Sequence, residues 1–169
     1  SIASYRMCGN GSAGGIVGWA SVCTISNCYN AGTITNEKYE YSARSGGIAG
    51  AVSSGSAIGN CYNTAAVSAK MYSKPDSAYA GGIVGAAYSG TVQSCYGIGT
   101  VTATVQNTDG TAAAGGVVGL SDNSTIMDCY YLNVCSLGVG SGTDTATRCN
   151  EAQLKAPGTY LEFDFTNVW

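Results

Sequence analysis

The sequence contains no histidine, only 2 prolines and few charged residues. Histidine is the commonest general base and the commonest protein ligand for metals, so Ser-His-Asp triads and HExxH zinc sites are excluded. Charged residues make up 10% of the chain, and the formal net charge is -3 with Lys and Arg scattered singly. The chain therefore lacks the basic stripe that would neutralise nucleic-acid phosphates, and we expect no nucleic-acid partner.

Long apolar runs are also missing. No stretch of about 18 apolar residues is present, so we expect no membrane insertion. The first residues lack the charged start and apolar middle of a secretory signal. Only Ser1 to Ser12 precede the first repeated motif. We therefore expect a longer parent protein to supply further repeats or domains before Ser1, together with any export signal.

What the sequence does contain is a fourfold repeat. Four motifs share a glycine pair followed by apolar residues, and each precedes a Cys-Tyr pair: AGGIVGWA, SGGIAGAV, AGGIVGAA and AGGVVGLS. The Cys-Tyr pairs begin at Cys28, Cys61, Cys95 and Cys129, so successive pairs are 33, 34 and 34 residues apart. A regular period of this length is the signature of stacked repeat units.

The residue types in each unit favour strands over helices. The units are rich in Gly, Val, Ile, Thr, Ser and Tyr and poor in Leu, Glu and Lys, the reverse of helix propensity. Three strands per unit, closing one coil, predict an all-β fold in which equivalent side chains stack along an axis. We expect a right-handed β-solenoid (β-helix) of about four coils.

Two columns of the repeat are expected to form the core ladder. One consists of the apolar residues three positions before each cysteine: Ile25, Ile58, Val92 and Ile126. The other consists of the cysteines themselves: Cys28, Cys61, Cys95 and Cys129. Free thiols behaving as small apolar side chains are favoured for this column. Disulfides between coils are the alternative, although parallel side chains are poorly disposed for the required dihedral angle.

The remaining cysteines lie outside the repeat register. Their proximity in sequence suggests two disulfides that would staple the ends, Cys8 with Cys23 and Cys135 with Cys149. A metal site is not expected, because a ladder presents its sulfurs in a line whereas zinc needs four converging ligands. We expect no cofactor either.

Tyrosine is the candidate ligand-binding residue. Tyr29, Tyr62, Tyr96 and Tyr130 should form an outward column, which either binds a partner or simply shields the strands. The variable segments between units read as exposed loops and hold many of the charges. If a binding surface exists, these segments and the residues next to them are the first place to look: Tyr39, Tyr41, Tyr72, Tyr79 and Tyr88.

A repeat of this kind allows two other functions. A β-helical polysaccharide-active enzyme needs converging carboxylates, for which Asp122 and Asp128 are the nearest candidates. An ice-binding solenoid needs a regular hydroxyl array, and Thr33/Thr35 and Thr100/Thr102 offer only an interrupted one. The β-propensity of Thr explains these pairs adequately. We therefore expect no enzyme activity.

The C-terminal segment departs from the repeat. TRCNEAQLKAP predicts a short helix with its N-cap at Thr147 or Asn150 and its end before Pro157. The alternation around Phe163 and Phe165 predicts an edge or covering strand. We therefore expect a repeat solenoid over residues 1–135 and a helix-plus-strand cap over residues 136–169, covering the last coil.

The motif AGGIVGAAYSGTVQSCYGIGTVTA and its three partners resemble the GLUG-motif repeats of bacterial surface proteins. The resemblance covers Ala13 to about Tyr131. NEAQLK followed by FDFTNVW is similar to segments that follow such repeats in large secreted or wall-attached proteins. These include adhesin-like proteins and the non-catalytic regions of IgA-specific metallopeptidases.

The resemblance implies an extracellular module, displayed on the bacterial cell surface or secreted. No catalytic residue is carried over, because the metallopeptidase zinc motif requires histidine and this chain has none. We expect a structural or adhesive module of a larger protein, whose loops bind a host glycan or protein.

Overall fold

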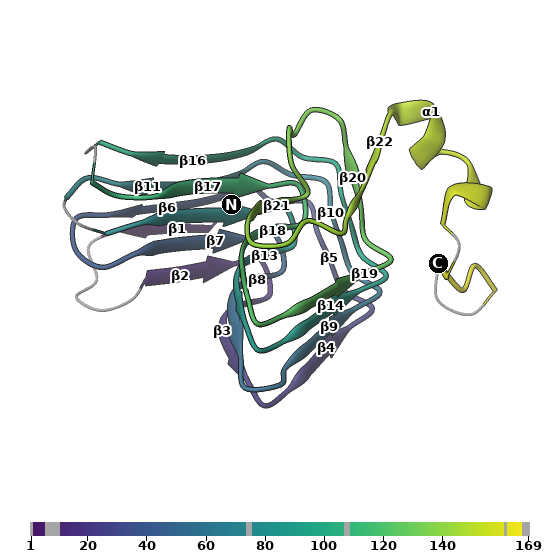
Figure 1. Ribbon diagram of the computed structural model, residues 1–169, viewed down its shortest axis with the longest axis horizontal. Coiled ribbons are helices and arrows are strands. Elements are labelled where there is room, and N and C mark those ends of the chain that lie inside the picture. The colour runs from purple at the N-terminus through teal and green to yellow at the C-terminus, as the bar shows by residue number, and fades with distance from the viewer. Residues whose placement is uncertain (1, 6–10, 74–75, 107–108, 161, 167–169) are drawn as a thin grey trace.

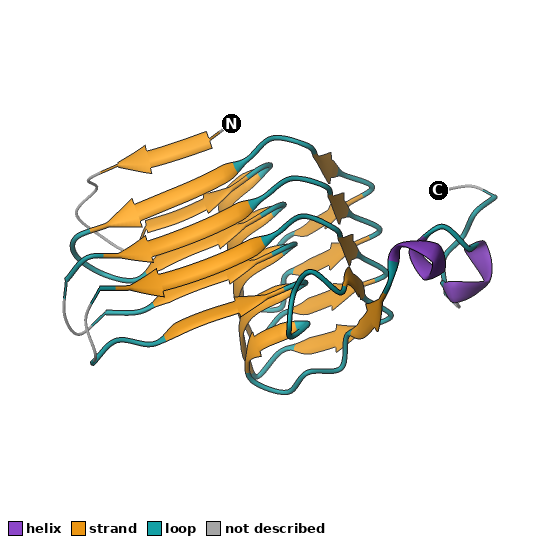
Figure 2. Cartoon of the chain, turned by 90° about the horizontal axis from the view of Figure 1, so that it is seen from above, coloured by secondary structure: helices purple, strands orange, loops and turns teal. Residues whose placement is uncertain are grey.

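The computed structural model describes residues 2–5, 11–73, 76–106, 109–160 and 162–166. These residues form an all-β solenoid whose strands pair in parallel from one coil to the next (Figure 1). A short helical segment stands to one side of the coils, as Figure 2 shows from above. The predicted β-solenoid is confirmed.

Five parallel sheets run along the solenoid axis, each taking one strand from every coil. The first is β1 (Ile2–Tyr5), β6 (Ile34–Lys38), β11 (Val67–Met71) and β16 (Val101–Val105). The second is β2 (Gly11–Gly14), β7 (Ala43–Gly46), β12 (Ala78–Gly81) and β17 (Ala112–Gly115). The third is β3 (Val17–Ser21), β8 (Ala49–Ser53), β13 (Val84–Tyr88), β18 (Val118–Asp122) and β21 (Val139–Ser141).

The other two sheets lie on the side of the coil that carries the cysteines. One consists of β4 (Thr24–Ser26), β9 (Ala57–Gly59), β14 (Thr91–Gln93) and β19 (Thr125–Met127). The other consists of β5 (Tyr29–Asn30), β10 (Tyr62–Asn63), β15 (Tyr96–Gly97), β20 (Tyr130–Leu132) and β22 (Thr147–Cys149). Each complete unit therefore contributes five short strands, and the expectation of three was wrong.

The two additional strands arise because corners divide the repeat motifs and because strands extend into the variable segments. The glycine pair forms a corner: β2 ends at Gly14 and β3 begins at Val17. A Cβ atom on Gly82 would collide with the carbonyl oxygen of Gly116 in the next coil. Glycine is needed here because successive backbones approach too closely for any side chain.

Two further corners repeat a left-handed residue in every coil. Positive φ angles of 49° to 57° recur at Val22, Ser54, Ser89 and Asn123 and at Asn27, Asn60, Ser94 and Asp128. Small polar residues predominate at these positions because they tolerate the left-handed region better than bulky ones do. The corners keep the strands of successive coils in register.

The core consists of stacked apolar columns. Ile48, Ile83 and Val117 are fully buried, and so are the residues that follow them, Ala49, Val84 and Val118. In a regular strand, alternation would turn only one member of each pair inward. Both are buried because the glycine corner lies immediately before them. A second cluster fills the space between the first two sheets, with Ile34, Val67 and Met71 at its centre.

The fourth unit is incomplete. The first sheet ends at β16, so no strand of the fourth unit follows it in that sheet. After β20 the chain instead returns to the third sheet as β21 and then to the fifth as β22. The solenoid therefore makes about 3 turns, not the four predicted. Its sheets also continue to Cys149, beyond the boundary expected at residue 135.

The C-terminal segment begins as expected and then differs. The helix α1 (Glu151–Leu154) has Asn150 as its N-cap, which accepts a hydrogen bond from the Gln153 amide at 2.9 Å. A 3₁₀ turn, η1 (Pro157–Thr159), follows. Phe165 lies in a turn and Phe163 in an irregular segment, so the predicted strand is wrong. The fifth sheet ends at β22, and no described residue after Cys149 adds a strand to it.

Candidate functional site

The five tyrosines expected to bind a ligand divide into two groups. Tyr39 and Tyr41 lie in the loop between β6 and β7, and Tyr72 directly follows β11 in the next coil. These loops lie at the opposite end of the long axis from α1 (Figure 1). Tyr79 and Tyr88 lie instead on β12 and β13. The structure therefore brings only the first three together.

A surface hollow lies beside the first group. It has a volume of about 570 Å³ and is lined by Tyr39, Glu40, Tyr41, Ser73 and Asp76. We call this set the loop site. Tyr39 is 50% exposed and Tyr41 is 49% exposed, so both rings present apolar surface to solvent. Exposed rings beside two carboxylates suit a ligand that carries both hydroxyl groups and an apolar face.

The conformation of Tyr41 is fixed by its neighbour in the next coil. Its φ angle is 61°, in the left-handed region, and among the non-glycine residues described it is the single such residue outside the two repeated corners. Its amide donates a hydrogen bond to Oδ2 of Asp76 at 2.8 Å. A bulky residue in this region costs about 1 to 2 kcal/mol, and such strain clusters at binding sites.

Tyr72, which lies beside the loop site, contacts two charged residues. Tyr39 stacks on Tyr72 with ring centroids 4.6 Å apart, and the Tyr72 hydroxyl donates to Oε2 of Glu37 at 2.9 Å. The ammonium of Lys70 lies 4.5 Å from the Tyr72 ring centroid. Its hydrogen bond with Tyr72, more than the nearby Glu37, raises the pKa of Lys70. The stacked rings of Tyr39 and Tyr72 are therefore already ordered before a ligand binds.

The second group surrounds an arginine that the sequence analysis missed. Trp19 and Tyr88 stack with centroids 6.2 Å apart, and the Arg44 guanidinium carbon lies 5.8 Å and 5.7 Å from them. Arg44 Nε also donates to the Tyr88 hydroxyl at 3.1 Å. The signal was present: Arg44 is the one charged residue in a column otherwise formed by Ser12, Tyr79 and Ala113.

The expected tyrosine column is also formed, and its exposure falls along the axis. Tyr29, Tyr62 and Tyr96 stack with centroids 5.2 Å and 5.1 Å apart. Tyr29 is 61% exposed, whereas Tyr130 is 5% exposed because Tyr160 and Phe163 pack against it edge-on. The column therefore faces outward at the first coil and is covered at the last.

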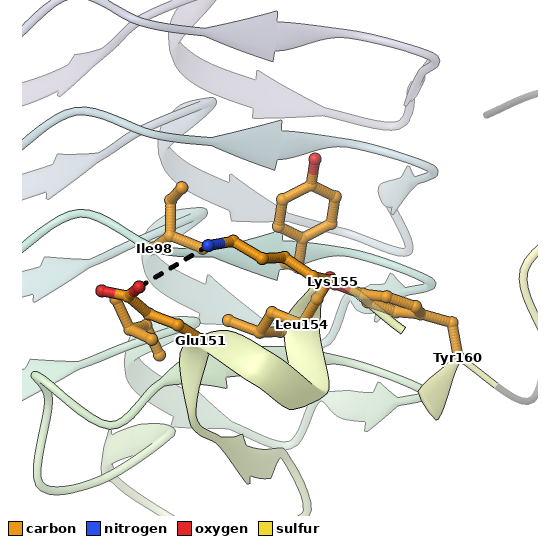
Figure 3. Close-up of a pocket in the computed structure, with 7 residues that line it drawn as sticks. Ile98, Glu151, Leu154, Lys155 and Tyr160 are labelled. Carbon is orange, nitrogen blue, oxygen red and sulfur yellow. Dashed lines mark hydrogen bonds and ion pairs between the residues drawn. The ribbon is translucent and has the colours of Figure 1, made fainter. Parts of the chain in front are cut away.

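A small cavity lies between this column and the C-terminal segment (Figure 3). It has a volume of about 280 Å³ and is lined by Tyr96, Ile98, Leu132, Glu151, Leu154, Lys155 and Tyr160. The Tyr160 hydroxyl donates to the Leu154 carbonyl at 2.7 Å, and burial raises the pKa of Tyr160 to about 12. An exposed ion pair, Lys155 to Glu151 at 3.7 Å, borders the cavity.

The cysteine column consists of free thiols. Cys61, Cys95 and Cys129 are buried and Cys28 is partly buried. Each Sγ donates a hydrogen bond to the carbonyl two residues earlier, for example Cys95 to Gln93 at 3.0 Å. Burial raises the pKa of Cys95 well above its usual value. The apolar column beside it is buried at Ile58, Val92 and Ile126, with Ile25 partly buried at the end.

The proposed end staples are not supported. Cys135 and Cys149 are both free, so the predicted disulfide between them is wrong. Cys135 packs in the solenoid core, whereas Cys149 packs in a separate cluster with Tyr130, Tyr160 and Phe163. Cys23 is a free, exposed cysteine, and Cys8 lies outside the described residues.

The acidic residues considered for catalysis and the potential metal ligands were located in the part of the chain that the structure describes. Asp122 and Asp128 stand at opposite ends of the segment that contains β19. Within the described residues, no group of three or more His, Cys, Asp or Glu side chains is arranged to hold a metal ion. No helix in that same portion is long and apolar enough to cross a membrane.

Comparison with known proteins identifies the repeat. No curated protein and no solved structure matches the chain significantly. A family model does match, and it covers the first repeat unit from the segment before β2 to the start of β6. The β-solenoid and this match together fit a structural repeat module, and residues 9–35 carry the GLUG motif.

Proposed function

We propose that the chain is a non-catalytic display module of a larger extracellular protein, on the bacterial cell surface or secreted. The rigid coils carry the loop site, and the loop site binds a host glycan. The motif match and the fold support the structural part of this proposal. The adhesive part rests on the loop site.

The observation that carries the proposal is the pairing of exposed rings with a fixed backbone. Tyr39 and Tyr41 are half exposed, yet one is stacked on Tyr72 and the other is bound through its amide to Asp76. Rings that are already ordered lose little entropy when they bind. Flat aromatic faces beside carboxylates match the alternating apolar and hydroxyl faces of a sugar ring.

The alternative functions gain less support from the structure. The enzyme alternative needs converging carboxylates, and the segment containing β19 separates Asp122 from Asp128. The ice-binding alternative needs a flat hydroxyl face. The pairs Thr35/Ser68 and Ser68/Thr102 do lie in register, but Glu37 and Lys70 share the same two strands. Charged side chains interrupt the regular array that ice binding requires.

The test is binding of the purified chain to an array of mammalian glycans. We expect the double variant Tyr39→Ala/Tyr41→Ala to lower the affinity for the glycan bound best by at least about tenfold, because two aromatic contacts are lost. The control is Tyr29→Ala, which removes a tyrosine that is 61% exposed and lies on β5, away from the loop site. Failure of the chain to bind any glycan, or equal losses in both variants, would contradict the proposal.

A further inference from the structure

The first coil exposes side chains whose counterparts in the later coils are buried or less exposed. Ile16 is 50% exposed, whereas its counterparts Ile48, Ile83 and Val117 are fully buried. Val17, Ile25 and Cys28 are partly exposed, and the aromatic rings of Trp19 and Tyr29 are 45% and 61% exposed. We call these six residues the N-terminal end face. Ile16, Val17, Ile25 and Cys28 begin core columns of the solenoid, and Trp19 and Tyr29 lie on the strands β3 and β5 of the same coil.

The backbone of the first coil also lacks the partners that later coils have. The amides of Tyr62, Tyr96 and Tyr130 each donate to the carbonyl of the cysteine one coil earlier, at 3.1, 3.1 and 2.9 Å. The amides of Ala57, Thr91 and Thr125 likewise donate to the preceding coil, each at 2.9 Å. Among the described residues, β4 and β5 end their sheets, so Thr24 and Tyr29 have no preceding coil to donate to.

The edge strands of this coil carry none of the features that protect an exposed edge. Residues 11–35, which hold β2 to β5, contain no Asp, Glu, Lys, Arg or Pro. Exposed edges are normally blunted by charge, proline or a covering segment. Strands without charged residues or proline are typical of positions that are paired with a neighbour on both sides.

One strand of a preceding coil is already in place. β1 pairs with β6 in the first sheet, and Ile2 lies opposite Ile34. Val67 of the following unit also lies opposite Ile34, so Ile2 occupies the place of Val67 in the repeat. In the complete units the strand of this first sheet directly follows one of the fifth sheet, as β6 follows β5 and β11 follows β10. An occupant of the end face would thus join β1 without a break.

We propose that the N-terminal end face is the docking surface for one further coil of the same repeat, belonging to the same polypeptide and ending in β1. That coil supplies four strands that pair in parallel with β2, β3, β4 and β5. Its apolar and cysteine columns continue those of Ile16 and Cys28. The inference rests on the stacking of the coils and is independent of the loop site.

The experiment extends the chain by a coil in this register. A copy of residues 43–65 is placed directly before Ser1, because Ser1 corresponds to Ala66. We expect the midpoint of thermal unfolding to rise by about 5 °C or more. We also expect amide exchange at Thr24 and Tyr29 to slow at least about tenfold. The control carries the same 23 residues in scrambled order, which should leave both readouts unchanged.

A substitution in the end face separates docking from a general effect of length. Ile16→Lys should shift the unfolding midpoint of the 169-residue chain little, because the side chain is half exposed. In the extended chain it should remove most of the gain. The proposal is overturned if the added coil leaves Thr24 and Tyr29 unprotected. It is equally overturned if the 169-residue chain protects these amides by dimerising at raised concentration, which would make the face an interface between copies.

Discussion

The two ends of the solenoid are built differently. At the C-terminal end, residues outside the repeat finish the core columns: Val139 continues the column of Val118 and is 2% exposed. Asp144 orders this closing segment by accepting hydrogen bonds from the amides of Gly138 at 2.8 Å and Ala146 at 3.1 Å. At the N-terminal end the same columns stop at Ile16 and Val17, with no comparable segment among the described residues.

The difference shows what a repeat can and cannot supply. Each unit buries its apolar face only against its neighbours, so stability comes from interfaces between coils. Closing an end requires residues that leave the repeat pattern, as residues 133–149 do. Charged side chains appear at the C-terminal end, at Asp144 and Arg148, and are absent from residues 11–35. Polarity thus marks the closed end of this solenoid.

The largest expected effect comes from comparing two positions of one core column, one in the middle of the solenoid and one at its N-terminal end. Ile83→Ala should lower the free energy of unfolding by about 3 kcal/mol, because a fully buried side chain leaves a cavity. Ile16→Ala, the matched control at the open end, should cost about 1 kcal/mol or less, since half of its surface is already in water. Urea denaturation of both variants is the measurement. Equal losses would show that the open end is as tightly packed as the middle.

A pH titration should sharpen the comparison along the tyrosine column. Burial raises the pKa of Tyr160 to about 12, above the value of about 10 expected in the unfolded chain. The folded state therefore favours the neutral phenol. Its contribution to stability is complete below about pH 10 and is lost as the pH rises toward 12.

Unfolding by urea at a series of alkaline pH values measures this effect. Tyr160→Phe should reduce the fall in stability above about pH 10, although Tyr96 and Tyr131, whose pKa values burial also raises, keep part of it. Tyr29→Phe removes a hydroxyl group at the exposed end of the same column and is the matched control. If the two variants behave alike, the C-terminal segment does not cover the column in solution.

The smallest effect concerns the ion pair beside the cavity. Lys155→Ala should change the free energy of unfolding by less than about 0.5 kcal/mol, because both partners are more than three-quarters exposed and 3.7 Å apart. Leu154, which packs against the buried aromatic cluster, provides the control. Leu154→Ala should cost more than Lys155→Ala. The reverse order in thermal unfolding would mean that charge, not apolar packing, holds this segment to the solenoid.

Much of the fold follows directly from the repeat. The spacing of Cys28, Cys61, Cys95 and Cys129 predicts that equivalent residues stack, and the structure places Tyr29, Tyr62, Tyr96 and Tyr130 in register. The number of strands per coil does not follow, because the glycine pair is a corner only when the next coil presses against it. Of the five tyrosines proposed to bind a ligand, Tyr39 and Tyr41 line the loop site and Tyr72 stacks on Tyr39, while Tyr79 and Tyr88 lie elsewhere.

The sequence alone determined that this protein is a stack of parallel strands, because side chains at a fixed period can be buried only on their own counterparts. It also limited the helix N-cap to Thr147 or Asn150, since capping is a local interaction, and the structure selects Asn150. The tertiary structure alone decided where the C-terminal aromatics pack, which cysteines share a cluster and what surrounds Arg44. These outcomes depend on residues that are distant in sequence, and no local pattern specifies which of them meet.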